Sequence, residues 1–382
     1  MGMIYKLSTG DEIHRYKKSI VMQFNGKRKV LSTSVINGGY NEELKCVFNH
    51  DCNQGAGIAC KLRAATYKEH MAIIARELGL EVDTTAGIST AASMENVAIK
   101  MESFRGISVT AIVTGGIEVN GGRVGDPASY YEVEGKYEQI KEGTINIILL
   151  IDANLPAETM VRALVTCTEA KTAAIQELME GSKYSSGIAT GSGTDGTILV
   201  SNAESDMKLT HAGKHSKLGE LIGIAVKAAV KEALYLQTGL CPEGQHSVLR
   251  RVKRFGINED SVWEKYVIII TKIMEDKTIP ILKKASFIHN FHNVDGSKEL
   301  VPLLSLYIHL IDQFNWGLLS GEQVVYESQI MLKTIMERFN INNSINIFSK
   351  NYENGFQDEV VEFVIDNFVI VMALIAGGIK DV

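Results

Sequence analysis

Residues 187–223 read GIATGSGTDGTILVSNAESDMKLTHAGKHSKLGELIG, and the rest of the chain is interpreted outward from this stretch. A glycine-rich turn around Asp195 precedes TILVSN, a run typical of a β-strand, and a polar loop then leads to Ser216, a good helix cap. Apolar residues follow at helical spacing: Leu218, Leu221, Ile222, Ala225, Ala229 and Ala233. The stretch therefore predicts an amphipathic helix, starting at about Lys217, that packs on a sheet.

The segment before this stretch predicts a central strand and a second helix. TINIILLI at 144–151 is an apolar run typical of a buried strand, and Pro156 is suited to the first turn of the helix that follows. The apolar stripe of that helix is interrupted by TEAKT at 168–172. Two interpretations stay open: Thr168 and Thr172 are satisfied core residues, or the helix directs this polar segment into a site. The stripe comprises Met160, Val161, Leu164, Val165, Ile175, Leu178 and Met179.

The N-terminal part adds strands and one helix. SIVMQF at 19–24 and KRKVLSTSVI at 27–36 are β-like runs joined by Asn25-Gly26, which predicts a hairpin. Helical spacing predicts a helix at about 64–78 that stops at Gly79. Residues 84–128 are rich in β-formers and contain glycine pairs that allow close approach.

Two domains are expected because the strand patterns of the first part of the sequence give way to mostly helical patterns near Cys241-Pro242. Residues 1–240 read as an α+β, or mixed α/β, domain with helices packed on a sheet. Residues 241–382 read as a mostly α-helical domain whose role the sequence does not indicate; an oligomerisation module is one option, so a homo-oligomer stays open. The apolar segment 360–379 contains Glu362 and Asp366, which favours a buried helix over a membrane span.

Composition excludes several classes of function. The chain has 382 residues with a formal charge of −6, so it has no broad basic field for nucleic acid or an anionic membrane. Its 5 cysteines are an odd number without a CxxC pair, which suits a reducing compartment. The N-terminus lacks the apolar run of a secretory signal, and a cytoplasmic location is expected.

The chemistry-bearing residues gather in the opening stretch. The turn at 190–196 is a poor phosphate loop because a strand follows it, but its backbone N–H groups could stabilise an oxyanion, with Asp195 as acid or base. His211 and His215 are separated by Gly213, so a helical metal face is not predicted, and HNFH at 289–292 is a weak ligand pattern. His215 precedes a helix N-terminus beside Lys214, and His50 is a second candidate.

Several motifs together resemble the adenosylcobinamide amidohydrolase family, CbiZ. They lie in order between residues 20 and 238: INGGY at 36–40, NH at 49–50, ELGL at 77–80, AGISTAASMENVAI at 86–99, VTAIVTGGIEVNGGRVGDPA at 109–128, TINIILLIDANL at 144–155, TEAKTAAIQEL at 168–178, ATGSGTD at 189–195 and GKHSKLGELIG at 213–223. The resemblance implies hydrolysis of the amide that joins a corrin propionate to aminopropanol. The products would be adenosylcobyric acid and 1-amino-2-propanol, a step in corrinoid salvage.

A corrin is large, flat and fringed with amides, so its pocket needs glycine-lined approaches and many hydrogen-bonding groups. The substrate carries its own cobalt, and the resemblance requires no cofactor or metal on the protein. The residues expected to bind the corrinoid are Asn37, Gly38, Gly39, Glu95, Asn96, Thr114, Gly115, Gly116, Asn120, Thr190, Gly191, Thr194, His211 and Lys214.

The catalytic hypothesis has His215 or His50 as base, with Asp195 or Glu169 orienting it. Lys171 or backbone N–H groups would stabilise the developing charge. Direct attack by water and a threonine nucleophile, such as Thr190 or Thr194, both stay open. Two rival functions remain. One is a corrinoid-binding or sensing protein without catalysis, and the other is a nucleotide-dependent transferase, which the poor phosphate loop disfavours.

Overall fold

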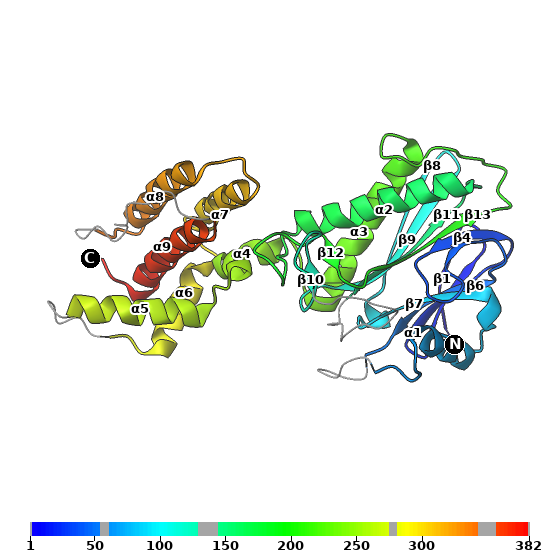
Figure 1. Cartoon of the computed structure of the whole chain (residues 1–382), viewed down its shortest axis with the longest axis horizontal. Coiled ribbons are helices and arrows are strands. Elements are labelled where there is room, and N and C mark those ends of the chain that lie inside the picture. The colour runs from blue at the N-terminus through cyan, green and yellow to red at the C-terminus, as the bar shows by residue number, and fades with distance from the viewer. Residues whose placement is uncertain (1, 54–60, 129–143, 275–280, 343–356, 381–382) are drawn as a thin grey trace. The chain divides into compact units, whose positions relative to one another are not determined.

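The computed structural model describes residues 2–53, 61–128, 144–274, 281–342 and 357–380. The chain divides into two units, Met1–Cys241 and Pro242–Val382 (Figure 1). The first unit contains the β-sheets and three long helices, whereas the described part of the second unit is helical. This is the α+β class with a helical C-terminal region that the sequence predicts.

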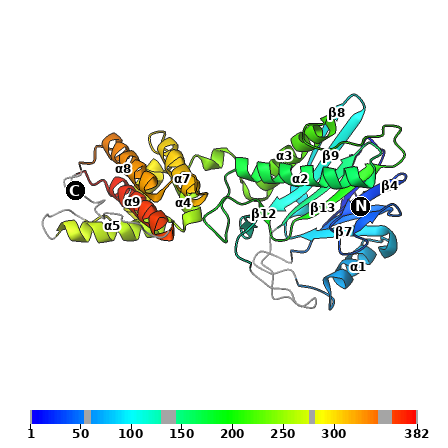
Figure 2. The ribbon, with the colours of Figure 1, turned by 45° about the horizontal axis from the view of Figure 1, so that its top comes forward.

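Two sheets stack in the first unit (Figures 1 and 2). The first sheet has the strand order β1 (Gly2–Lys6), β2 (Glu12–Tyr16), β3 (Ser19–Gln23), β6 (Cys46–Asp51) and β7 (Thr85–Thr90). The second sheet has the order β5 (Gly39–Asn41), β4 (Arg28–Ser32), β13 (Gly196–Asn202), β11 (Thr144–Ile151), β9 (Ile107–Gly116) and β8 (Ala98–Phe104). A small ladder pairs β10 (Gly121–Gly122) with β12 (Gly191–Ser192).

Helices complete a four-layer arrangement. α2 (Ala157–Glu177) and α3 (Lys217–Thr238) cover one face of the second sheet, and α1 (Tyr67–Glu77) covers the outer face of the first sheet. Apolar side chains fill the layer between the sheets, including Ile20, Val30 and Ile148. Every residue of β11 is buried, so the predicted central strand is confirmed.

The helix that begins at Lys217 is confirmed in detail. The Ser216 hydroxyl accepts a hydrogen bond from the Gly219 amide at 3.0 Å, and Gly239 ends α3 with a φ of 72°. The apolar positions predicted from the sequence are all buried. α2 and α3 run in the same direction, since the start of α3 lies near Arg162 and Lys227 pairs with Glu177.

The predicted hairpin at Asn25-Gly26 is wrong. β3 pairs with β2 and β6 in the first sheet, whereas β4 pairs with β5 and β13 in the second. Neither Asn25 nor Gly26 has the positive φ of a tight hairpin turn. Both strands contribute side chains to the layer between the sheets, so the chain crosses from one sheet to the other at this point.

The predicted apolar stripe of α2 is also wrong in part. Val161 and Val165 are 52% and 41% exposed, while small residues make up much of the buried face. The prediction placed large side chains on the buried face. In the structure, alanine and cysteine residues on this face let the helix lie close to its neighbours. The buried residues are Thr159, Met160, Ala163, Thr166, Cys167, Ala170, Ala174 and Ile175.

The second unit packs its helices around α9 (Gln357–Gly377). This helix is long and apolar enough to cross a membrane by composition, yet 61% of its most apolar window is buried within the unit. A bidentate ion pair between Arg254 and Asp312 links η4 (Lys253–Phe255) to α7. The remaining α-helices are α4 (Val248–Val252), α5 (Glu259–Met274), α6 (Lys284–Asp295), α7 (Val301–Asn315) and α8 (Gly321–Arg338).

Candidate active site

A buried network of amide side chains joins the two sheets near the start of β11. Asn146 Nδ2 donates to Asn49 Oδ1 at 2.8 Å and to the Ser89 carbonyl at 2.9 Å, and its Oδ1 accepts from the Gly196 amide at 3.0 Å. Asn49 Nδ2 donates in turn to Thr114 Oγ1 at 2.7 Å. Buried polar groups are costly unless they are paired, so this network fixes five strands relative to one another.

Asp195 and Lys171 lie at the same end of the second sheet. The Asp195 carboxylate accepts hydrogen bonds from the Ile145 amide at 2.9 Å and from the Ser192 amide and hydroxyl at 3.1 and 2.7 Å. It also forms an ion pair with Lys171, and both side chains are only 13% exposed. These donors hold the carboxylate in place beside the Lys171 ammonium.

We call the start of β11 with these neighbours the polar end, defined by Asn49, Thr144, Asn146, Lys171 and Asp195. Glycine is required beside it: a Cβ on Gly191 would lie 2.4 Å from Asp195 Oδ2 and 2.8 Å from Lys171 Nζ. The turn GSGTDG therefore lets the backbone pass close to the ion pair.

The threonines of the polar end differ in their bonding. Thr144 Oγ1 and Thr194 Oγ1 are 2.6 Å apart, and either can be the donor. Thr190 Oγ1 instead accepts a hydrogen bond from the Val124 amide at 2.9 Å. The Thr172 hydroxyl donates to the Thr190 carbonyl at 3.2 Å, which ties α2 to the glycine-rich turn.

His50 lies near the polar end but on the outer face of the first sheet. Side chains alternate along β6, so Asn49 enters the amide network while His50 faces α1. Its Nδ1 is 2.8 Å from Ser19 Oγ. Burial lowers the pKa of the imidazole from 6.5 to about 4, and the nearby positive charge of Arg63 contributes to the same shift. His50 is therefore neutral at pH 7.

This shift predicts a pH-dependent stability. The unfolded chain binds a proton at His50 near pH 6.5 and the folded chain only near pH 4, so protonation favours unfolding. We expect the free energy of unfolding to fall by about 3 kcal/mol as the pH drops from 6.5 to 4. Urea unfolding across this range should show a weaker pH dependence of the unfolding free energy for His50→Gln than for the wild-type protein, with His215→Gln, a substitution at an exposed histidine, as the matched control.

A second group lies before the N-terminus of α3: His211, Lys214 and His215, with Glu169 of α2, which is two residues before Lys171. All four are exposed, and Lys214 pairs with Glu169 at 3.1 Å. The side chain of Leu234, near the other end of α3, lies beside Gly115 in the second sheet. At 1.5 Å per residue, Leu234 is about 26 Å along the helix from Lys217.

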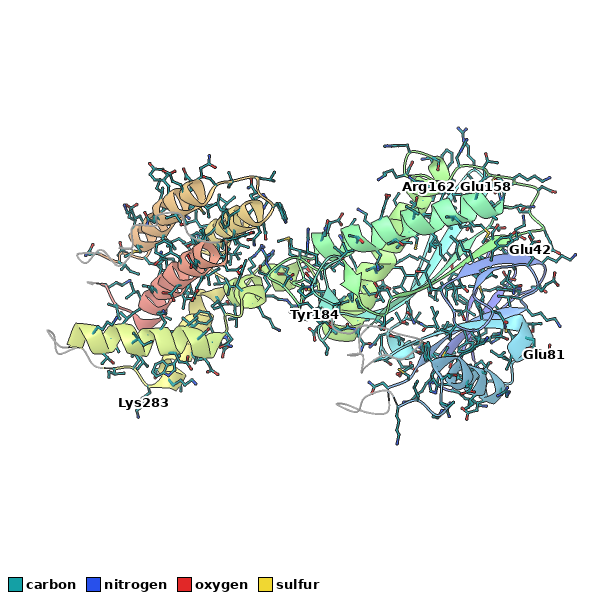
Figure 3. All side chains as sticks on the ribbon, in the orientation of Figure 1. Glu42, Glu81, Glu158, Arg162, Tyr184 and Lys283 are labelled. Carbon is teal, nitrogen blue, oxygen red and sulfur yellow. The ribbon has the colours of Figure 1, made fainter. Side chains whose placement is uncertain are left out.

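The structure thus does not bring His215 together with Asp195 or Lys171. Figure 3 shows the same separation: Arg162, which lies beside Gly213, is at the opposite end of α2 from Tyr184. Tyr184 contacts Gly122, whose strand pairs with the glycine-rich turn.

Other residues predicted to bind substrate are held by the fold. Asn37 Nδ2 donates to the carbonyls of Val82 and Thr85 at 2.6 and 2.9 Å. A Cβ on Gly38 would overlap a backbone carbonyl, and Gly39 has a φ of 79°. Glu95 pairs with Arg15 at 2.8 Å.

Some of the predicted binding residues do border the polar end. Thr114 belongs to the amide network, and Gly115 and Gly116 are paired with Ile145 and Thr144. Asn96 donates to Gln237 of α3 at 2.9 Å, and Asn120 is buried near the glycine pair 121–122.

Sequence reasoning missed Asn49, Thr144 and Asn146. A signal was present: TINIILLI carries polar residues at 144 and 146, which share one face of a strand that is otherwise apolar. Side chains at alternating positions point the same way, so two polar residues there required partners in the layer between the sheets.

Two further observations concern metals and cysteines. Among the described residues, no group of three or more His, Cys, Asp or Glu side chains is placed to hold a metal ion.

Cys52 is disulfide-bonded, which departs from the reduced state expected from the cysteine count, whereas Cys46, Cys167 and Cys241 are free.

Comparison with known proteins identifies the family. The family model for adenosylcobinamide amidohydrolase (CbiZ) matches residues 4–242, and the chain belongs to this family. Uncharacterized protein MJ1613 of Methanocaldococcus jannaschii is 38% identical over 231 residues, which is 58% of this chain and 87% of that protein. The second unit lies almost entirely beyond the family match.

Proposed function

We propose that the first unit hydrolyses adenosylcobinamide at the amide between the corrin propionate and aminopropanol. The products are adenosylcobyric acid and 1-amino-2-propanol. The family match over residues 4–242 is the observation that carries this proposal, because it spans both sheets and all of α1, α2 and α3.

We place the reaction at the polar end. An amide is a poor electrophile, so its hydrolysis needs a donor for the carbonyl oxygen and an activated nucleophile. Lys171 is a partly buried cation fixed by Asp195, and among the described residues the carboxylate is its one hydrogen-bond partner. Its remaining N–H donors are available to a substrate oxygen.

The corrinoid would approach the polar end past glycine residues, where the backbone carries no side chains. Gly116 ends β9 and is only partly buried, and Gly191 lies against the ion pair. Backbone without side chains permits the close contact that a flat macrocycle needs. The cobalt belongs to the substrate in this proposal.

The test is direct turnover by the full-length protein. Purified protein is incubated with adenosylcobinamide in chelator-treated buffer, and adenosylcobyric acid and 1-amino-2-propanol are followed by mass spectrometry. Both products are expected in equal amounts. Binding without product, even after divalent metal ions are restored, would instead assign the chain as a corrinoid-binding protein.

A further inference from the structure

The polar end contains a hydroxyl with an unusual setting. Thr144 is the first residue of the central strand β11 and is 5% exposed. Within the described part of the chain, its Oγ1 makes one hydrogen bond, to the hydroxyl of Thr194 at 2.6 Å. A hydroxyl partner can donate or accept, so it can receive a proton and pass it on.

Other hydroxyls nearby are committed to the fold. The Ser192 hydroxyl donates to the Asp195 carboxylate at 2.7 Å, and Thr114 Oγ1 is held by the amide network. Thr190 Oγ1 accepts from a backbone amide. Thr144 differs because, among the residues that the structure describes, neither a carboxylate nor a backbone group engages its oxygen.

The neighbours of Thr144 connect it to the ion pair of the polar end. Its partner across the β9–β11 ladder is Gly116, which has no side chain. The next residue, Ile145, donates its amide to Asp195, which pairs with Lys171. Thr144 is therefore linked to the Lys171 ammonium through its neighbour Ile145, by the Ile145–Asp195 hydrogen bond and the Asp195–Lys171 ion pair. It lies on a strand that pairs with a neighbouring strand on each side.

We propose that Thr144 is the nucleophile of the hydrolysis, with Thr194 as its proton carrier and Lys171 as the donor to the substrate oxygen. This inference rests on the proposed function, since it requires an amide substrate. The scissile amide lies on a slender side chain of the corrin, so a recessed hydroxyl can reach it while the macrocycle stays outside.

The reaction has two balanced steps. Thr144 Oγ attacks the amide carbon, a C–O bond forms and the C–N bond breaks. The hydroxyl proton passes through Thr194 to the nitrogen, which leaves as 1-amino-2-propanol. Water then attacks the ester on Thr144, the ester C–O bond breaks, and the products are the corrin carboxylic acid and the free hydroxyl.

Kinetics and trapping test the nucleophile. Thr144→Ala is expected to lower kcat by at least about 10³-fold, while Thr144→Ser stays within about tenfold of wild type because it keeps the hydroxyl. Thr168→Ala serves as the matched control, since the exposed Thr168 hydroxyl donates to the Leu164 carbonyl within α2, and should turn over normally. Acid quenching during turnover should yield the corrin acyl group on the peptide that contains Thr144.

A second probe separates this inference from the proposed function. A β-lactone, which acylates activated hydroxyls, should label Thr144 in the wild-type protein without any corrinoid. Labelling with no adenosylcobinamide turnover would keep the nucleophile and overturn the substrate. Turnover by Thr144→Ala within about tenfold of wild type, or labelling at another residue, would overturn the nucleophile. If Thr144→Ala fails to fold, the label on the wild-type chain and the Thr144→Ser rate still decide.

Discussion

Replacing Lys171 with methionine is expected to lower kcat for adenosylcobinamide hydrolysis by about 10²- to 10³-fold, the usual effect of removing one donor to an oxyanion. Lys171 is 13% exposed and held by Asp195, so its ammonium is fixed before the substrate arrives. Methionine has a similar length and leaves three hydrogen bonds to Asp195 in place.

Lys214→Met is the matched control for this prediction. It removes the same charge from the exposed pair with Glu169, before the start of α3. We expect its kcat and KM to stay close to wild type. Equal losses in both variants would mean that net charge, rather than the position of Lys171, governs the rate.

Replacing Arg28 with methionine is expected to destabilise the first unit by about 3–5 kcal/mol, because it leaves a buried carboxylate unpaired. Arg28 donates to both oxygens of Asp11 at 2.8 Å, and the two side chains are 2% and 0% exposed. This pair joins β4 of the second sheet to the turn after β1 of the first. Hydrogen-exchange mass spectrometry reports the stability of this unit separately from the helical one.

Two further variants test whether the destabilisation by Arg28→Met comes from the buried ion pair. Arg63→Met removes an arginine with the same bidentate geometry toward Glu77, but that pair is exposed and should cost less than about 1 kcal/mol. The double variant Arg28→Met with Asp11→Asn should recover part of the loss, because the buried charge is gone. A loss for Arg28→Met as small as that for Arg63→Met would contradict the structural role of the pair.

Local signals in the sequence predicted much of the fold. Ser216 before an apolar period defined the start of α3, and the mostly apolar run at 144–151 defined the central strand. These elements follow from caps and periodicity, which act within a few residues.

These local signals do not determine which strands pair when they are far apart in the sequence. The hairpin prediction used the turn dipeptide Asn25-Gly26, but the partners of β3 and β4 are more distant strands in two sheets. In α2, small residues make up much of the buried face because close packing against α3 favours small side chains, and a search for a stripe of large apolar residues does not detect them.

The candidate site was predictable only in part. Asp195 and Lys171 were both singled out, and the structure joins them, but their pairing crosses 24 residues of chain. His215 was favoured because it precedes a helix N-terminus, and the direction of α3 then places it far from that pair. The amide network depends on side chains from three strands and backbone groups from two more, so no local pattern specifies it.

The most direct measurement of the central claim compares Asp195→Ala with His215→Ala in steady-state hydrolysis of adenosylcobinamide. These residues lie at opposite ends of the second sheet and cannot share one small reaction centre. The polar-end site predicts that kcat/KM falls by at least about 100-fold in Asp195→Ala and stays near wild type in His215→Ala. The reverse result, with His215→Ala inactive and Asp195→Ala active, would contradict it and move the active site to the start of α3.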